Sequence, residues 1–205
     1  MVNILQVVEY RTDCFIVFKR RMGCFMESYH DRRIVKTKKL LYETLLDLLV
    51  TTPLNHITVK KLCDKADINR NTFYYHFNCI DDLLLEIINN FKKQEEALMS
   101  PVSDMYQYAL ELCLLYKQNT HLVTVLLSGN VNVSFIYHFL DFNYLSTYSV
   151  PSEARKNPNL TALMTSYIQV STFTIIAKWL EQHCSPSESQ IAHILCQLWN
   201  TPVSC

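Results

Sequence analysis

Glycine is nearly absent from this chain: two of its 205 residues, Gly23 and Gly129, are glycine. A dinucleotide-binding fingerprint needs three closely spaced glycines, a Walker loop needs Gly followed by Lys, and a nucleophile elbow has the form Gly-x-Ser-x-Gly. Gly23 precedes Cys24 and Gly129 precedes Asn130, so none of the three motifs is encoded. Few glycines and six prolines also disfavour a turn-rich all-β fold, so we expect helices.

The eight cysteines are too widely spaced for a zinc ribbon or a redox motif. The closest pair, Cys196 and Cys205, lies nine residues apart, and none of the seven histidines begins His-Glu-x-x-His. Cys63, His76 and Cys79 lie near one another in sequence, but no fourth metal ligand is indicated. We therefore expect no metal, no cofactor, no catalytic residue and no enzymatic activity, and free thiols in a reducing cytoplasm.

One uncharged run has about the length that crosses a lipid bilayer. It extends over 21 residues, from Asn157 to Ala177, and a membrane-spanning helix needs about 20 apolar residues. Seven residues of this run are serine, threonine or glutamine. Such a helix suits burial between other helices better than burial in lipid, so we expect no membrane association.

Charge is distributed unevenly, although 19 basic residues balance 19 acidic ones overall. Residues 31–78 carry nine lysines and arginines against five acidic residues, a net charge of +4. Residues 79–205 carry six basic against eleven acidic residues, a net charge of −5. A basic module followed by an acidic, apolar one favours a polyanion-binding domain on a non-binding body, although a basic surface can also arise by chance.

The basic module contains start and stop signals for three short helices. Apolar residues at helical spacing predict a first helix from Arg33 to Val50, which Pro53 ends. Thr58 is a suitable N-cap for a second helix to Ala66, and Asn69 for a third from Arg70 to Phe77. Two short capped helices joined by a three-residue turn predict a helix-turn-helix.

The remainder of the chain also has a helical pattern, so the expected fold class is all-α. A fourth helix begins near Cys79, and Gly129 separates two of the later helices. We expect further helices over residues 103–117, 119–127, 131–149, 160–183 and 187–200. The predicted domains are an N-terminal extension (1–30), a helix-turn-helix domain (31–80) and a helical effector-binding and dimerisation domain (81–205).

Three stretches of the basic module resemble a known family. They are Thr58-Val-Lys-Lys-Leu-Cys-Asp-Lys-Ala66, Ile68-Asn-Arg-Asn-Thr-Phe-Tyr-Tyr-His-Phe77 and Asp81-Asp-Leu83. Together they are similar to the DNA-binding domain of TetR-family (TetR/AcrR-type) transcriptional regulators, over about residues 33–91. A weaker second resemblance, over Tyr167 to Leu198, is to the C-terminal domain of a Firmicutes-type branch of this family.

This resemblance implies that the third helix enters the major groove of double-stranded DNA. Arginine pairs with guanine and asparagine with adenine through two hydrogen bonds, whereas tyrosine and histidine more often contact phosphates. The expected DNA-binding residues are Lys36, Thr58, Asn69, Arg70, Asn71, Thr72, Tyr74, Tyr75 and His76. The chain departs from the family at Asp67, where glycine is usual, and at Ile80, where a phosphate-contacting lysine is common.

The resemblance also implies a homodimer that binds a near-palindromic operator, with the last two long helices of each subunit at the interface. The expected interface residues are Ile175, Ile176, Trp179, Leu195, Leu198 and Trp199. Aromatic and methionine residues of the body are candidates for an effector pocket, although their helical spacing equally fits a plain core. The pocket candidates are Met105, Tyr106, Phe135, His138, Phe142, Met164 and Tyr167.

The expected function is sequence-specific DNA binding that controls transcription, with repression favoured over activation and a small-molecule effector releasing or modulating the protein. Two alternatives stay open: a regulator controlled by a partner protein, and a non-regulatory chromosome-organising DNA-binding protein. The expected location is the cytoplasm of a bacterium, in association with the nucleoid. For residues 1–30, a start at Met22 or Met26 and an extra helix near the DNA-binding domain both remain possible.

Overall fold

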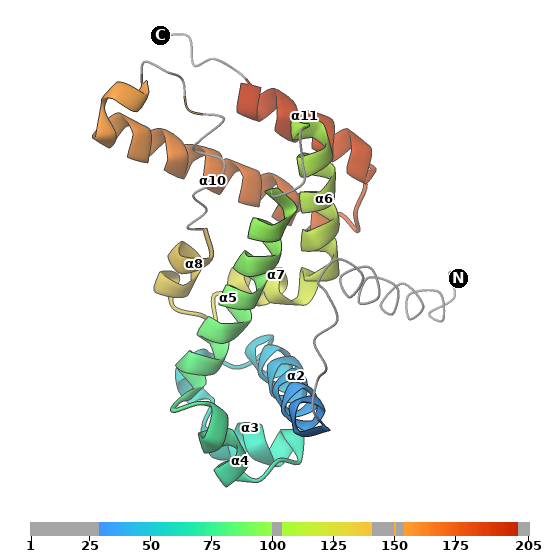
Figure 1. Ribbon diagram of the computed structural model, residues 1–205, viewed down its shortest axis with the longest axis vertical. Helices are drawn as coiled ribbons and strands as arrows, with labels where there is room; N and C mark the ends of the chain where they lie inside the picture. The colour runs from blue at the N-terminus through green and yellow to red at the C-terminus, as the bar shows by residue number, and fades with distance from the viewer. Residues whose placement is uncertain (1–28, 100–103, 141–149, 151–153, 201–205) are drawn as a thin grey trace. The chain divides into compact units, whose positions relative to one another are not determined.

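A computed structural model describes residues 29–99, 104–140, 150 and 154–200 (Figure 1). The predicted extension lies outside the described residues, except for residues 29 and 30. So do residues 141–149, which the sequence analysis assigns to a helix, and with them Phe142. The chain divides into two compact units, residues 1–38 and 39–205, and each is described by itself.

Every regular element within the described residues is a helix, which confirms the expected all-α class. The elements in chain order are α2 (Tyr29–Leu49), the 3-10 turn η1 (Leu54–His56), α3 (Val59–Ala66), α4 (Arg70–His76), α5 (Ile80–Met99), α6 (Met105–Gln118), α7 (Thr120–Leu127), α8 (Val133–Leu140), the 3-10 turn η2 (Ala154–Lys156), α10 (Pro158–Glu181) and α11 (Glu188–Asn200).

Helix α2 begins in the first unit and ends in the second. In the first unit Arg32, Arg33 and Lys36 are exposed. In the second unit Leu41 and Leu45 are fully buried, four residues apart on one face of the helix. The apolar stripe that predicted this helix is therefore the stripe that it buries.

Side-chain caps define the two short helices of the helix-turn-helix. The Thr58 hydroxyl accepts a hydrogen bond from the Lys61 amide (3.1 Å) at the start of α3, and Asn69 Oδ1 accepts one from the Asn71 amide (2.8 Å) at the start of α4. Between the helices Asp67 has φ 52 and ψ 46, the left-handed conformation that glycine adopts most easily. The turn thus has the geometry that the family resemblance implies, with aspartate in place of glycine.

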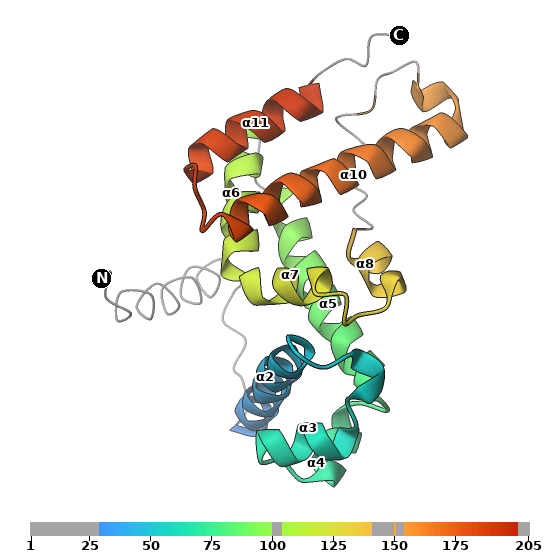
Figure 2. The same cartoon turned by 180° about the vertical axis from the view of Figure 1, so that it is seen from behind.

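Within the second unit, α3 and α4 lie at one end, α10 and α11 lie at the other, and α5 runs between them (Figure 1). Figure 2 shows α6 beside α11, and these two helices form the most extensive helix pair in the unit. The helix-turn-helix and the helical body, predicted as separate domains, therefore both belong to the unit 39–205. Helix α5 is the element that they share.

Two tryptophans fix the ends of the C-terminal pair of helices. Trp179 Nε1 donates to the carbonyl oxygen of Pro186 (2.6 Å), which secures the connection between α10 and α11. Trp199 Nε1 donates to Thr172 Oγ1 (2.9 Å), and this bond is buried. Satisfying both indole N–H groups allows two large rings to be buried without an unpaired donor.

Helix α10 contains the uncharged run and by length and composition alone could cross a membrane. It does not pack as a fully buried core helix either, since 33% of its most apolar window is buried. One face, which includes Ile168, Phe173 and Ile176, packs into the core of the unit. The opposite face, with Leu163, Tyr167 and Val170, is exposed. The sequence predicted that this helix is buried between other helices, and within one chain only one of its faces is buried.

Candidate nucleic-acid interface and effector region

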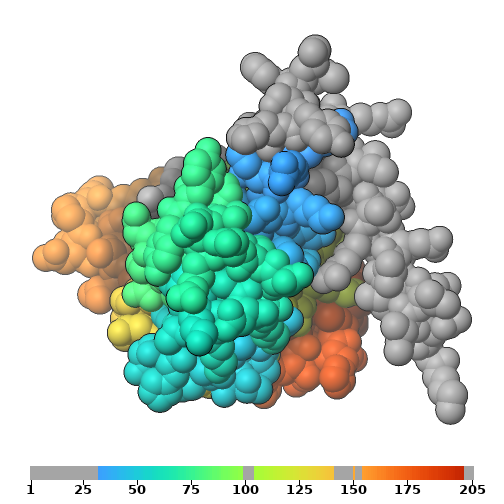
Figure 3. All heavy atoms as spheres, turned by 90° about the horizontal axis from the view of Figure 1, so that it is seen from below, coloured from blue at the N-terminus to red at the C-terminus, as the bar shows by residue number. Residues whose placement is uncertain are grey.

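Helix α4 presents polar and aromatic side chains on one exposed face. Arg70 and Asn71 are exposed in its first turn, and Tyr74 and Tyr75 are 56% and 71% exposed one turn later. Phe73 is fully buried and anchors the opposite face of the helix. In the space-filling view of Figure 3, seen from the α3–α4 end, atoms of these helices lie at the surface. The helix therefore offers its charged and amide groups to an external partner.

The other predicted DNA-binding residues differ in their exposure and in whether their side chains already form a hydrogen bond or a ring contact. Thr58 and Asn69 are exposed, but their side-chain oxygens already cap α3 and α4. Thr72 and His76 are half-buried, and the His76 ring packs edge-on against Tyr75, with 4.9 Å between ring centroids. The Asn69 cap fixes where α4 begins, and the predicted residues of α4 with exposed side chains are Arg70, Asn71, Tyr74 and Tyr75.

Basic side chains on α3, which the candidate set drawn from the sequence omitted, are exposed as well. Lys60, Lys61 and Lys65 are exposed on the helix that precedes α4. Lys61 Nζ also donates to Thr52 Oγ1 (3.4 Å), which holds the lysine near the end of α2. The feature of the sequence that could have identified these three lysines is the net positive charge of residues 31–78. Ile80, where the family commonly has lysine, is buried and cannot contact phosphate.

The loop between α7 and α8 contacts the end of α2. Asn130 Nδ2 donates to the carbonyl oxygen of Leu49 (2.8 Å), and the Leu54 amide donates to the carbonyl oxygen of Asn130 (2.8 Å). Gly129, with φ 75, makes the turn that precedes Asn130. Asn130 thus satisfies one of the terminal carbonyls that a helix leaves unpaired, and does so across 81 residues of sequence.

The predicted effector-pocket residues do not share one environment. The Tyr106 ring packs against His193 of α11, with 4.6 Å between ring centroids, and Tyr167 is 58% exposed on the outer face of α10. Phe135 is buried, and His138 Nε2 bonds to Asn89 Oδ1 (2.8 Å). Met105 and Met164 are half-buried, and Phe142 lies outside the described residues. Tyr167 therefore does not line an interior pocket, because it faces away from the core.

Two buried polar groups that the candidate set did not include lie in the body. Glu95 on α5 is 2% exposed, and Tyr116 on α6 is fully buried. Burial raises the pKa of the Glu95 carboxyl well above its usual range, and Lys92 partly opposes this. Burial also raises the pKa of the Tyr116 hydroxyl, and the nearby Glu95 carboxyl adds to that rise. Glu95 follows Phe91 by one helical turn, so the sequence did place a carboxyl on an apolar stripe.

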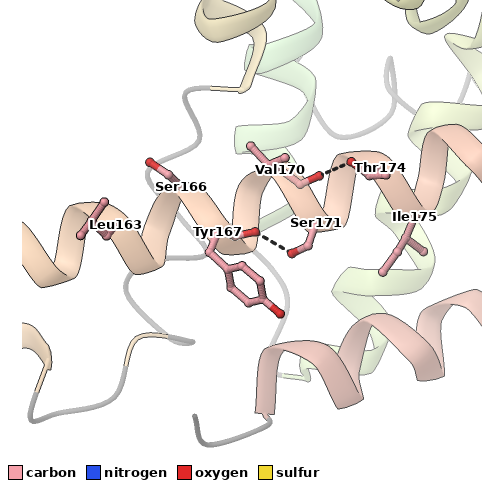
Figure 4. Close-up of a pocket in the computed structure, with 7 residues that line it drawn as sticks. All are labelled: Leu163, Ser166, Tyr167, Val170, Ser171, Thr174 and Ile175. Carbon is pink, nitrogen blue, oxygen red and sulfur yellow. Dashed lines mark hydrogen bonds between the residues drawn. The ribbon is translucent and has the colours of Figure 1, made fainter. Parts of the chain in front are cut away.

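The outer face of α10 is a shallow, apolar surface formed by one helix (Figure 4). Its lining residues are Leu163, Ser166, Tyr167, Val170, Ser171, Thr174 and Ile175. The Ser171 hydroxyl donates to the Tyr167 carbonyl (2.6 Å) and the Thr174 hydroxyl to the Val170 carbonyl (2.7 Å). Because these hydroxyl protons are used within the helix, the face presents mainly carbon to a partner.

Four of the six predicted dimer-interface residues lie inside a single chain. Ile176, Trp179, Leu195 and Trp199 are each at most 3% exposed. A side chain already covered by its own chain cannot supply the surface of a dimer, so this assignment needs correction for these four. Their hydrophobicity reflects the core between α6, α10 and α11. Ile175 and Leu198 are half-buried and remain candidates.

A metal site is not indicated in the part of the chain that the structure describes. No three histidine, cysteine, aspartate or glutamate side chains come together there in a way that could hold an ion. Cys63, which the sequence places near His76 and Cys79, is buried, whereas Cys79 is exposed.

Solved structures show which known proteins share this fold. A TetR transcriptional regulator from Streptococcus agalactiae is 22% identical, with a TM-score of 0.60, over 84% of this chain and 98% of that one. The fatty acid degradation regulator FadR from Bacillus halodurans is 15% identical, with a TM-score of 0.54, over 80% and 94%. A transcriptional regulator from Aquifex aeolicus is 13% identical, with a TM-score of 0.52, over 78% and 95%. No family model and no curated protein matches the chain.

The raised pKa of Glu95 predicts a pH-dependent stability that Glu95→Gln removes. The unfolded chain releases the Glu95 proton near pH 4.3, whereas the folded chain retains it at higher pH. The wild-type free energy of unfolding should therefore fall, relative to the variant, by up to about 1.4 kcal/mol per pH unit above pH 4.3, until the folded protein also ionises. Urea titrations from pH 4 to pH 8 measure this difference. Parallel pH profiles for the two proteins would contradict it.

Asn130→Ala should loosen the end of α2 without unfolding the body. One hydrogen bond contributes about 1 kcal/mol, so we expect amide exchange over residues 50–57 to accelerate about fivefold. Hydrogen–deuterium exchange with mass spectrometry measures this. Asn132→Ala is a matched control, because Asn132 Oδ1 accepts from the Ser134 amide within the body (3.0 Å). Equal exchange over residues 50–57 in both variants would show that Asn130 does not hold α2.

Proposed function

We propose that this chain, which has the fold of TetR-family transcriptional regulators, is a sequence-specific DNA-binding regulator of transcription. One observation carries the proposal: α4 is anchored by buried Phe73 and exposes Arg70, Asn71, Tyr74 and Tyr75 together. We place its action on the nucleoid, in the cytoplasm of a bacterium.

The chemistry of these side chains matches the edges of base pairs in the major groove. Arg70 can donate two hydrogen bonds to guanine, and Asn71 can both donate to and accept from adenine. Tyr74 and Tyr75 can donate their hydroxyl protons to phosphates, and Lys60 adds a charge that neutralises phosphate. The base contacts would select the sequence, while the phosphate contacts would fix the register of α4.

Arg70→Ala tests the base contact. Losing one bidentate pair costs roughly 1–3 kcal/mol, so affinity for a duplex that the wild-type protein selects from random DNA should fall about 5- to 150-fold. Binding to unrelated DNA should change much less. A gel-shift titration of both duplexes gives the two affinities.

Lys93→Ala is the matched control, since Lys93 is an exposed basic residue of α5 outside the helix-turn-helix. It should leave both affinities within about twofold, because exposed charges more than a Debye length from the DNA are screened. A selected-site affinity that Arg70→Ala leaves unchanged would defeat the assignment of α4 as the reading helix.

We further propose that the protein is a homodimer that binds a near-palindromic operator. The outer face of α10 supports this, because Leu163, Tyr167 and Val170 form an exposed apolar surface without a charged residue between Asn157 and Ala177. Ile194 on α11 is also 44% exposed and can extend this surface. Homodimer interfaces are more apolar than ordinary protein surface, and two-fold symmetry presents the same face from both subunits.

Val170→Glu should separate the subunits. An uncompensated charge in an interface costs about 3 kcal/mol or more, so the dissociation constant of the dimer should rise over about 100-fold. Sedimentation equilibrium measures it. Leu114→Glu makes the same chemical change at an exposed position on α6 and should leave the dimer intact. Equal dissociation constants for the two variants would remove α10 from the interface.

An effector-controlled repressor is the form of regulation that the body supports best. Buried Glu95 lies on α5, the helix that continues from the helix-turn-helix into the body, and buried Tyr116 on α6 packs against Phe91 of α5. Asn130 supplies a second connection between the body and α2. A ligand that moves α5 or the Asn130 loop would change the orientation of α4. Selection of many unrelated DNA sites would instead favour a chromosome-organising protein.

A further inference from the structure

Tyr42, in the part of α2 that belongs to the second unit, joins α2 to α5 through two side-chain hydrogen bonds. Its hydroxyl donates to Glu86 Oε1 and accepts from Asn90 Nδ2 (3.3 Å), and both partners lie on α5. Glu86 and Asn90 are four residues apart, so they lie on one face of α5, one turn from each other. Tyr42 is 44 and 48 residues away from them in sequence, so this contact belongs to the tertiary structure.

The chemistry of the three groups gives each hydrogen bond one direction. Burial raises the pKa of the Tyr42 hydroxyl, and the hydrogen bond and charge of Glu86 raise it further, whereas the Asn90 hydrogen bond lowers it. The phenol therefore keeps its proton at neutral pH and donates it to the carboxyl. An ionised carboxyl only accepts and an amide NH2 only donates, so Tyr42 cannot exchange the roles of its two partners.

The apolar contacts around Tyr42 fix the position of α2 along α5 less sharply than these bonds do. Leu41 and Leu45 of α2 and Leu84 and Ile88 of α5 belong to one hydrophobic cluster, and the Tyr42 ring packs against it. Hydrophobic burial is non-directional, whereas a hydrogen bond weakens steeply when its length or angle changes. A small shift of α2 along α5 would therefore keep much of the buried apolar area and break both bonds.

Helices α2, α3 and α4, which we call the three-helix module, pack together around that cluster. Leu45 of α2, Leu62 of α3 and Phe73 of α4 are all fully buried in it. Lys61 of α3 also bonds to Thr52, just after α2 (3.4 Å). A contact that holds α2 on α5 therefore also holds the exposed face of α4.

The contacts of Tyr42 lie well beyond the connection between α4 and α5. Helix α4 ends at His76 and α5 begins at Ile80, so three residues connect them. With a rise of 1.5 Å per residue, Glu86 and Asn90 lie about 9 Å and about 15 Å along α5 from its first residue. A short connection can act as a pivot, and a contact at a distance from the pivot restricts rotation more than one beside it. Tyr42 is thus well placed to restrict rotation of the three-helix module on α5.

We propose that Tyr42 is a positioning residue that determines which half-site separation the protein selects, through its bonds to Glu86 and Asn90. This inference rests on the proposed function, since it takes α4 as the reading helix of a two-fold dimer. In such a dimer, rotation of each three-helix module on its α5 changes the distance between the two α4 helices. Tyr42 acts on this distance through α2 and α5, without a contact to a base.

Inverted-repeat duplexes with different spacers test this role on the full-length protein. One base pair added between the half-sites that the wild-type protein selects moves them apart by about 3.4 Å and rotates them by about 34°. Gel-shift titrations give the dissociation constants for the altered and the selected duplex, and we call their ratio the spacing discrimination. In Tyr42→Phe it should fall about tenfold, toward one. The wild-type protein must break a hydrogen bond to a carboxyl to fit the altered spacing, and the variant has none to break.

Matched variants separate the hydrogen bond from the loss of a hydroxyl as such. Tyr137→Phe removes the same group from a tyrosine of α8 that is 68% exposed, and should retain the wild-type spacing discrimination. Glu86→Ala should lower the discrimination as Tyr42→Phe does, and the double variant should lower it no further, because both changes remove one bond. Glu86→Gln should restore most of it, since the amide oxygen still accepts from Tyr42.

A role of Tyr42 in folding alone would give a different result. Lower stability reduces the fraction of folded protein, and so weakens binding to both duplexes by the same factor. The spacing discrimination would then stay at its wild-type value. Urea titrations of each variant measure the folded fraction, and Glu86→Ala decides the question by the same ratio if Tyr42→Phe does not fold.

Two results would overturn the proposal: a wild-type spacing discrimination in folded Tyr42→Phe, or effects of Tyr42→Phe and Glu86→Ala that add in the double variant. Either result, in a protein that still selects an inverted repeat, would reject the role of Tyr42 and leave the proposed function intact. A wild-type protein that selects no DNA sequence would reject the proposed function and this inference with it.

Discussion

The burial of Phe73 is the constraint on which the candidate interface depends. Phe73 is fully buried in the same hydrophobic cluster as Leu62 and Leu45, and burying a phenylalanine side chain contributes about 1.5–3 kcal/mol. A helix as short as α4 is not stable by itself, so this anchor sets which face turns outward. Asn71 and Tyr75 lie on the side of α4 away from Phe73, and Arg70 is exposed in the first turn of the helix. The pair of caps at Thr58 and Asn69 then fixes where the helices begin.

Several specific contacts link α2 and the helix-turn-helix to α5 and the body. Helix α5 is continuous from Ile80 to Met99 and carries Glu95 near its far end. Tyr42 on α2 donates to Glu86 and accepts from Asn90 (3.3 Å), both on α5. Asn130 contributes the other tie, and His121 on α7 lies 3.7 Å from Asp47 on α2. A displacement of α5 or of the Asn130 loop would therefore act directly on α2, which packs beside the helix-turn-helix.

Local signals in the sequence predicted the helix-turn-helix well. Thr58 and Asn69 cap the helices that they were expected to cap, and Asp67 adopts the left-handed turn. These features depend on a few neighbouring residues, which is why spacing and residue type reveal them. Glu95 also had a local signal, since it occupies a buried position one turn after Phe91.

Features that depend on distant residues could not be predicted in the same way. Ile176 and Trp199 are apolar whether they face their own core or a second subunit, and only the fold shows that the core covers them. Tyr167, expected in a pocket, lies on the outer face of α10 for the same reason. The hydrogen bond between Asn130 and Leu49 joins residues 81 positions apart, and the local sequence around either residue does not predict it.

The symmetry of the DNA that this protein selects tests the central claim most directly. Two α4 helices related by a two-fold axis would contact half-sites one helical turn apart, about 34–36 Å, or a multiple of it. Repeated selection from a random-sequence pool, followed by sequencing, should therefore yield one motif made of two inverted half-sites separated by about 10 base pairs or a multiple. A selected pool without inverted symmetry, or one that does not converge on any motif, would contradict the account.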